Sequence, residues 1–162
     1  MVQVAPGYPQ SAILNLRSPI FNPQSPIPDL QSAIASRAGA CLAVGMEIRQ
    51  RDKQLPFTTK DGSTIRSLLD RSNAPVQGQS LAEATLPAGG ATDRHYHRAS
   101  EEFYYLLEGR GLIEIDGDAC EVGEGDAILI PAGAWHQIRA IEALRFLCCC
   151  APPYAHDDTY LL

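Results

Sequence analysis

Three of the four histidines of this 162-residue chain, together with one glutamate, are the side chains best placed to do chemistry. His95 and His97 are two apart in a predicted strand, so both imidazoles project from the same face. We expect the next strand, which begins at Glu102, to run back beside the first and bring its carboxylate next to them. His136 follows a tight turn at 131–133 and can complete the cluster in a closed β structure. Three imidazoles and one carboxylate suit a transition metal such as Zn, Fe, Ni, Co or Mn.

The elements that must position these residues are short strands. From Met46 onward, apolar or alternating runs are separated by turn residues, which is typical of a sandwich or barrel of antiparallel strands with little helix. After a turn at 61–63, Ile65, Leu68 and Leu69 allow a single helical turn. The predicted strands are 79–86, 94–98, 102–107, 111–115, 119–122, 127–130, 135–139 and 143–150.

Residues 1–45 differ in composition from the rest of the chain. They hold six of the twelve prolines and only three charged residues, so they cannot build a core alone. We predict an irregular or disordered N-terminal extension over 1–45 and a β-barrel domain over 46–162. Because Met46 opens a stretch that reads as a complete domain, the extension is alternatively sequence from an upstream start codon.

The charge and the cysteine content indicate which binding partners and which cellular compartment to expect. The net charge is −6 and no basic run is present, which disfavours nucleic acid and anionic membranes as partners. The five cysteines lack the spacing of a disulfide framework, so we expect a reducing, cytoplasmic location. No apolar stretch reaches the roughly 20 residues of a membrane-spanning helix, and no secretory signal is expected. In the last predicted strand, Cys148 and Cys150 share a face with Phe146, so we expect buried packing thiols.

The spacing of the candidate ligands resembles the two sequence motifs of the cupin family. The first motif consists of Gly89, His95, His97, Glu102 and Gly109, which are separated by five, one, four and six residues in that order. The second, with five, one and two intervening residues, consists of Gly125, Pro131, Gly133 and His136. The family's second motif often continues to an Asn three or four residues further on, where this chain has Arg139 and Ala140. That departure affects a loop contact and no ligand.

This resemblance implies an all-β fold: an antiparallel jelly-roll (double-stranded β-helix) barrel with a metal at its wide end. It implies one divalent transition metal per chain, namely Fe, Mn, Ni or Zn, bound by His95, His97, Glu102 and His136. Glu101 competes with Glu102 for the carboxylate role, but Glu102 fits the spacing, and neighbouring strand residues face opposite ways. Such a site has a formal charge of about +1, attractive to small anions or enediol-like oxygens.

The sequence provides weaker support for a functional role of the remaining candidate residues. Tyr104 shares the inward face of Glu102 and is a candidate hydrogen-bond donor behind the ligands, with plain core packing as the alternative. No other catalytic residue is predicted. His156 lies outside both motifs and is expected to be a surface or tail-packing residue. Aromatic residues expected to serve in packing or at an interface are Phe103, Tyr105 and Trp135.

The expected function is that of a metal-dependent enzyme acting on a small oxygen-rich substrate, such as a carboxylate, an enediol or a sugar, that chelates the metal. Members of the family with this ligand set include dioxygenases, decarboxylases, isomerases and lyases, and we place a dioxygenase ahead of a decarboxylase or an isomerase. The alternatives are a non-catalytic cupin that binds or senses a small ligand, and a structural or storage cupin. The expected assembly is a homodimer paired through its sheets.

Overall fold

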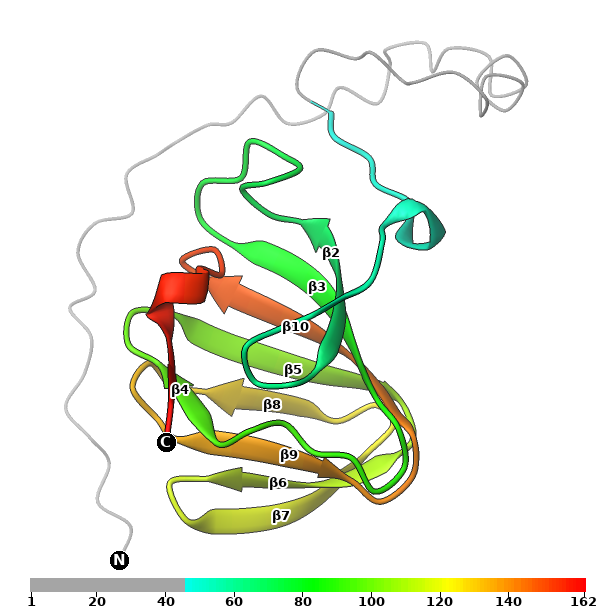
Figure 1. Cartoon of the computed structure of the whole chain (residues 1–162), viewed down its shortest axis with the longest axis vertical. Helices are drawn as coiled ribbons and strands as arrows, with labels where there is room; N and C mark the ends of the chain where they lie inside the picture. The colour runs from blue at the N-terminus through cyan, green and yellow to red at the C-terminus, as the bar shows by residue number, and fades with distance from the viewer. Residues whose placement is uncertain (1–45) are drawn as a thin grey trace, which may run out of the picture. The chain divides into compact units, whose positions relative to one another are not determined.

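The computed structural model describes residues 46–162, and the predicted N-terminal extension lies outside the described residues. Two antiparallel sheets face each other (Figure 1), which confirms the predicted all-β jelly roll. The six-stranded sheet has the order β1 (Phe57–Thr58), β2 (Thr64–Leu69), β3 (Ser80–Leu86), β10 (Leu144–Ala151), β5 (Glu101–Glu108), β8 (Ala127–Ile130). The five-stranded sheet has the order β11 (Thr159–Leu161), β4 (His95–His97), β9 (His136–Ala140), β6 (Arg110–Ile115), β7 (Asp118–Gly123). Two short 3-10 helices, η1 (Arg51–Lys53) and η2 (His156–Asp158), complete the described part of the chain.

The core lies between the sheets because apolar residues alternate along the strands. Leu106 of β5 and Phe146 of β10 face inward from the six-stranded sheet, and Ile138 of β9 meets them from the five-stranded sheet. All three side chains are almost completely buried. The same alternation turns Phe103 and Tyr105 of β5 outward. The period of two therefore decides which side chains meet in the interior.

All eight predicted strands are present, each within one residue of its expected bounds. The helical turn predicted around Ile65, Leu68 and Leu69 is wrong, because Thr64–Leu69 forms β2 and pairs with β3. Ile65 lies opposite Ala84 and joins the core, so the ladder and the buried side chain outweigh the local preference. The sequence also gave no indication of β11 in the C-terminal tail.

The expected pairing of the strand of His95 and His97 with the strand of Glu102 is also wrong. β4 pairs with β9 and β11, whereas β5 pairs with β10 and β8 in the facing sheet. The chain changes sheets at Ala99 and Ser100, whose backbone N–H groups donate hydrogen bonds of 3.0–3.1 Å to the Asp158 carboxylate. The side chain of Glu102 therefore approaches the imidazoles across the barrel interior.

Gly109, the last glycine of the first motif, makes the tight turn from β5 to β6 possible. Its φ is +86°, and a Cβ atom there would collide with the carbonyl oxygen of Ala143. Only glycine meets both conditions, so this motif position is structural.

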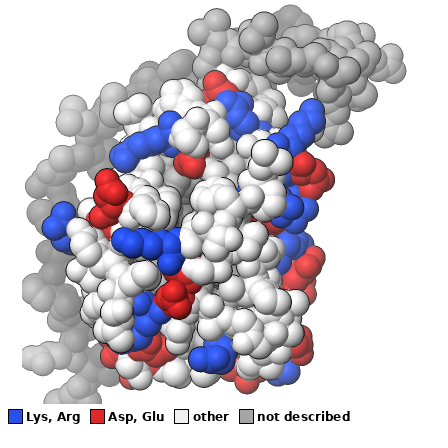
Figure 2. All heavy atoms as spheres, viewed as in Figure 1, with Lys and Arg blue, Asp and Glu red and all other residues white. Residues whose placement is uncertain are grey.

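The described surface carries charges of both signs. On the face drawn in Figure 2, basic and acidic side chains are interspersed, as the lack of a basic run in the sequence suggests. No helix within residues 46–162 has the length and apolar character needed to cross a membrane.

Candidate metal centre

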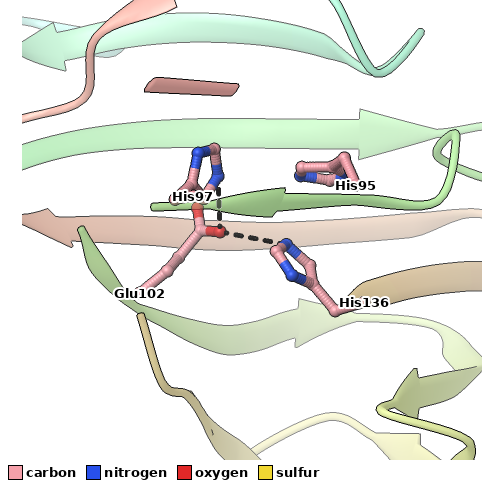
Figure 3. Close-up of side chains that lie close together, drawn as sticks. All are labelled: His95, His97, Glu102 and His136. Carbon is pink, nitrogen blue, oxygen red and sulfur yellow. Dashed lines mark ion pairs between the residues drawn. The ribbon is translucent and has the colours of Figure 1, made fainter. Parts of the chain in front are cut away.

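Four buried side chains converge inside the barrel, as the sequence predicted. His95 and His97 come from β4, and His136 from the neighbouring β9, where it lies directly opposite His95. Glu102 enters from β5 in the facing sheet. One nitrogen or oxygen atom from each residue lies within 4.8 Å of the others. Figure 3 shows the Glu102 carboxylate linked to His97 and His136, with His95 alongside.

Hydrogen bonds to the outer nitrogen of each imidazole orient the rings. Nδ1 of His95 lies 2.7 Å from the carbonyl oxygen of Asp93, and Nδ1 of His136 lies 3.0 Å from that of Ala134. Because a carbonyl oxygen only accepts, each Nδ1 carries a proton, and in the neutral tautomer that fits this contact the lone pair is on Nε2.

A hydroxyl plays the corresponding part for the third imidazole. Nδ1 of His97 lies 3.3 Å from Oγ1 of Thr159, a residue of β11 that pairs with His97 across the strands. This arrangement directs Nε2 of His97 toward Glu102. The three rings are thus held with their Nε2 atoms toward the interior, as metal-binding histidines are.

Glu102 is ionised in this setting. Burial by itself would raise its pKa, but the imidazoles of His136 and His97 outweigh burial and lower the pKa of Glu102 to about 2. Its Oε2 atom lies 3.3 Å from Nε2 of His97 and 3.5 Å from Nε2 of His136. Its Oε1 atom accepts a hydrogen bond of 3.4 Å from the Cys150 thiol. Burial, followed by the charge of Glu102, raises the pKa of Cys150, so this thiol stays protonated.

The histidines respond differently to burial. Burial and the neighbouring His136 lower the pKa of His95, which favours its neutral form. Burial opposes the charged form of His97 as well, but the nearby Glu102 carboxylate, 3.3 Å away, raises the pKa of His97. The cluster therefore combines a fixed negative charge with a neutral imidazole at His95.

The missing hydrogen bonds of two buried atoms in the cluster indicate whether a metal ion fits there. Within the described residues, Oε2 of Glu102 and Nε2 of His136 are buried and have no hydrogen-bond partner. An unsatisfied buried polar atom costs about 1–3 kcal/mol, so a pair facing each other needs an explanation. Both are lone-pair donors of the kind that borderline divalent metals prefer. The donor set and its orphaned atoms fit such an ion.

A cavity of about 260 Å³ opens beside this cluster. His95, His97 and Glu102 form part of its wall, whereas His136 does not line it. Apolar side chains that line the cavity are Phe57, Ile65, Leu81, Ala82 and Phe146. A small ligand in this space can reach the cluster.

The other predicted residues take distinct positions. Tyr104 is buried beside the cavity, with its ring centroid 6.2 Å from that of His136 and 4.8 Å from that of Phe146. Burial raises the pKa of Tyr104, so its phenol stays neutral. Glu101 and His156 are exposed and lie outside the cluster. As expected, Cys148 and Cys150 face inward with Phe146.

Sequence reasoning missed two residues at this site. Asp61, read only as a turn residue, is buried and places Oδ2 3.9 Å from Nε2 of His95. Thr159, which orients His97, belongs to the unpredicted β11. No local signal marks either residue, because each is brought to the site by a contact with a residue distant in the chain, Asp93 for Asp61 and His97 for Thr159.

Comparisons with known proteins agree with this geometry. A family model described as a cupin domain matches residues 82–150. The chain is 50% identical over 113 residues to the uncharacterized protein MJ1618 of Methanocaldococcus jannaschii, covering 68% of this chain and 90% of that protein.

Two further proteins are similar over part of their length. The dimethylsulfoniopropionate lyase DddW of Ruegeria pomeroyi is 35% identical over 82 residues, covering 50% of this chain and 53% of the lyase. The chain thus spans about half the length of that relative. Among solved structures, the oxalate decarboxylase of Bacillus subtilis matches with a TM-score of 0.63 at 21% identity, covering 74% of this chain and 33% of the decarboxylase. At this identity the structural likeness shows the fold alone.

Proposed function

We propose, starting from the fact that the chain belongs to the cupin superfamily, that it binds one divalent transition metal and is an enzyme for a small oxygen-rich molecule. The ligands would be His95, His97, Glu102 and His136. The observation that carries the proposal is the buried pair of unsatisfied atoms, Oε2 of Glu102 and Nε2 of His136. A bound ion would supply Lewis-acid polarisation of a carbonyl or hydroxyl oxygen of the ligand.

The side chains around the cluster have separate tasks in this proposal. Thr159 and the carbonyl oxygens of Asp93 and Ala134 hold the rings, so that each Nε2 faces inward. The Cys150 thiol donates to Oε1 of Glu102 and leaves Oε2 free. Tyr104, a neutral phenol beside the cavity, would orient the ligand or pack against it.

The reaction class rests on weaker support. The relative named as a lyase, at 35% identity over half of its length, favours bond cleavage assisted by a Lewis acid. The expectation of a dioxygenase ahead of a decarboxylase or an isomerase stays a prediction. Iron as the natural metal would favour the dioxygenase, and zinc or nickel would favour lyase or isomerase chemistry.

Elemental analysis of purified full-length protein tests the proposal, with Glu101 and Glu102 as a matched pair. Glu102→Ala removes the buried carboxylate, and Glu101→Ala removes its exposed neighbour on the same strand. We expect about one metal per chain in the wild type and in Glu101→Ala, and almost none in Glu102→Ala. Equal metal content in the two variants, or no metal in the wild type, would reject the site.

We also propose that the chain forms a homodimer through the outer face of the six-stranded sheet. Phe103 and Leu129 lie opposite each other on β5 and β8 and are 49% and 52% exposed, beside Tyr105 at 44%. Adjacent exposed apolar side chains on a sheet favour burial against a partner. Light scattering should show a dimer that Phe103→Glu dissociates, whereas Leu112→Glu on the other sheet leaves it intact. A monomeric wild type would contradict this proposal.

The location and the remaining partner expectations stay proposals as well. The cysteines, which lack the spacing of a disulfide framework, support a cytoplasmic location. The net charge of −6 supports an enzyme without nucleic-acid or membrane partners. Filter binding to DNA and RNA, and co-sedimentation with anionic vesicles, should both show no association at physiological salt.

A further inference from the structure

We infer that the cavity takes a neutral, hydroxyl-bearing ligand, one hydroxyl of which donates a hydrogen bond to Asp61, in preference to a dicarboxylate. This inference deepens the proposed metal-dependent function and rests on it. It comes from the position of Asp61 and from the charges that line the cavity.

Asp61 has one satisfied and one free carboxylate oxygen. Its Oδ1 atom accepts hydrogen bonds from the Thr59 hydroxyl and from the backbone N–H and hydroxyl of Ser63, the last two at 3.2 Å and 2.9 Å. Within the described residues, Oδ2 accepts no hydrogen bond, and this atom lies 3.9 Å from Nε2 of His95. The side chain is buried and lines the cavity. Oδ2 is therefore a fixed acceptor on the ligand side of the cluster.

The turn that carries Asp61 is tied to the strand that carries the histidines. The backbone N–H of Asp93 donates a hydrogen bond of 2.6 Å to the carbonyl oxygen of Asp61. The carbonyl oxygen of the same Asp93 accepts from Nδ1 of His95. The position of Oδ2 relative to the His95 ring is thus set by two short contacts through one residue.

The second aspartate of the cavity does not offer a comparable acceptor. Asp70 accepts hydrogen bonds from the backbone N–H and hydroxyl of Ser72 on Oδ1, and from the Ser67 hydroxyl on Oδ2. Both of its oxygens are satisfied within its own turn. Asp70 therefore contributes charge to the cavity and provides a matched control for Asp61.

The charges along the wall disfavour an anionic ligand. The described residues that line the cavity include three carboxylates, Asp61, Asp70 and Glu102, and no lysine or arginine. A divalent ion would offset two of these three negative charges, so the cavity would keep a formal charge of about −1 with neutral imidazoles. The sequence-based expectation of a site with a charge of about +1 that attracts small anions considered the four ligands alone.

Hydrogen-bond chemistry leads to the same ligand class. An ionised dicarboxylate has no proton to donate to Oδ2 of Asp61, and its charge would be repelled there. A hydroxyketone or a vicinal diol can present one oxygen to the metal and the proton of a neighbouring hydroxyl to Oδ2. A hydrogen bond to a charged acceptor favours the hydroxyl form by about 10-fold to 100-fold over an analogue without the proton.

Calorimetric titration of the zinc-loaded, full-length chain tests this preference with three probes. Dihydroxyacetone carries the hydroxyls, dimethoxyacetone lacks their protons, and malonate has the same three-carbon length with two negative charges. We expect the wild type to bind dihydroxyacetone at least about 10-fold more tightly than either other probe. In Asp61→Asn, the ratio of the Kd for dimethoxyacetone to the Kd for dihydroxyacetone should fall below about 3, and malonate should bind more tightly than it does to the wild type. Asp70→Asn should keep the wild-type order of the three probes.

The outcomes separate this inference from the proposed function. If the wild type holds zinc but prefers malonate, does not distinguish the two ketones, or fails to bind dihydroxyacetone, the inference is wrong and the metal site stands. An unchanged preference in a folded, zinc-loaded Asp61→Asn variant also overturns it. If the wild type holds none of zinc, iron, manganese and nickel, both proposals fall. Should Asp61→Asn not fold, the wild-type order of the three probes decides alone.

Discussion

The two ends of the barrel interior are built by the same strand alternation but filled with opposite chemistry. One end packs Leu106 and Ile138 from facing sheets into a buried apolar cluster. The other end turns His97, His136 and Glu102 inward and leaves two of their polar atoms without partners. The apolar end therefore supplies the stability that allows the polar end to keep unsatisfied groups for a ligand. Substitutions at the two ends should therefore have separable effects on stability and on metal binding.

The largest expected effect is on the apolar end. Leu106→Ala should lower the free energy of unfolding by about 2–5 kcal/mol, because it removes a completely buried side chain and leaves a cavity. Urea denaturation followed by circular dichroism measures this loss. Leu55→Ala, at an exposed position outside the proposed dimer face, should stay within about 0.5 kcal/mol of the wild type. Loss of metal from the folded Leu106→Ala variant would contradict the assignment of stability and metal binding to separate ends of the barrel.

The second largest expected effect is the loss of a metal ligand at the polar end. His136→Ala should weaken metal binding by more than about 100-fold, because it removes an Nε2 atom that has no other partner. Competition with a fluorescent chelator measures the affinity. His156→Ala, which removes an exposed imidazole, is the control and should bind metal normally. An equal affinity in both variants would remove His136 from the proposed ligand set.

Metal addition should stabilise only a chain with an intact polar end. At about 100 times its Kd, zinc should raise the free energy of unfolding of the wild type by about 2.7 kcal/mol, and a chelator should reverse the gain. Glu102→Gln should show little of this gain, because it lacks the charged oxygen that faces the imidazoles. Denaturation with and without zinc provides the measurement, and an equal gain in both chains would refute the role of Glu102.

The smallest expected effect concerns the support of one imidazole. Thr159→Val keeps the shape of the side chain but removes the hydroxyl beside Nδ1 of His97, and should lower metal affinity by about 10-fold. Thr85→Val, which removes a hydroxyl far along β3, serves as the control. Chelator competition again gives the affinity. Unchanged binding in Thr159→Val would mean that packing alone orients His97.

The chain sequence was sufficient for eight of the eleven strands within residues 46–162 and for the candidate ligands, because both depend on local spacing. Two residues of one strand that are two apart must share a face, so His95 and His97 could be paired without a structure. Turn residues such as Asp116 and Gly117, both with positive φ, placed the strand ends to within one residue.

Neighbours contributed by distant strands could not be read in the same way. Periodicity tells which face a residue occupies but not which sheet its strand joins, so the position of Glu102 opposite β4 was missed. For the same reason β2 was not predicted, because its Ile65 becomes buried only through pairing with β3.

The sequence alone thus determined that four candidate metal-binding side chains would turn inward from short antiparallel strands. The tertiary structure decided what surrounds them. It brought Thr159 to His97 and Cys150 to Glu102 through cross-strand pairing. It also placed the free oxygen of Asp61 beside His95 and set the charge of the cavity. These contacts join residues that are far apart in the chain, and no local pattern encodes them, because they depend on how two sheets close around one interior.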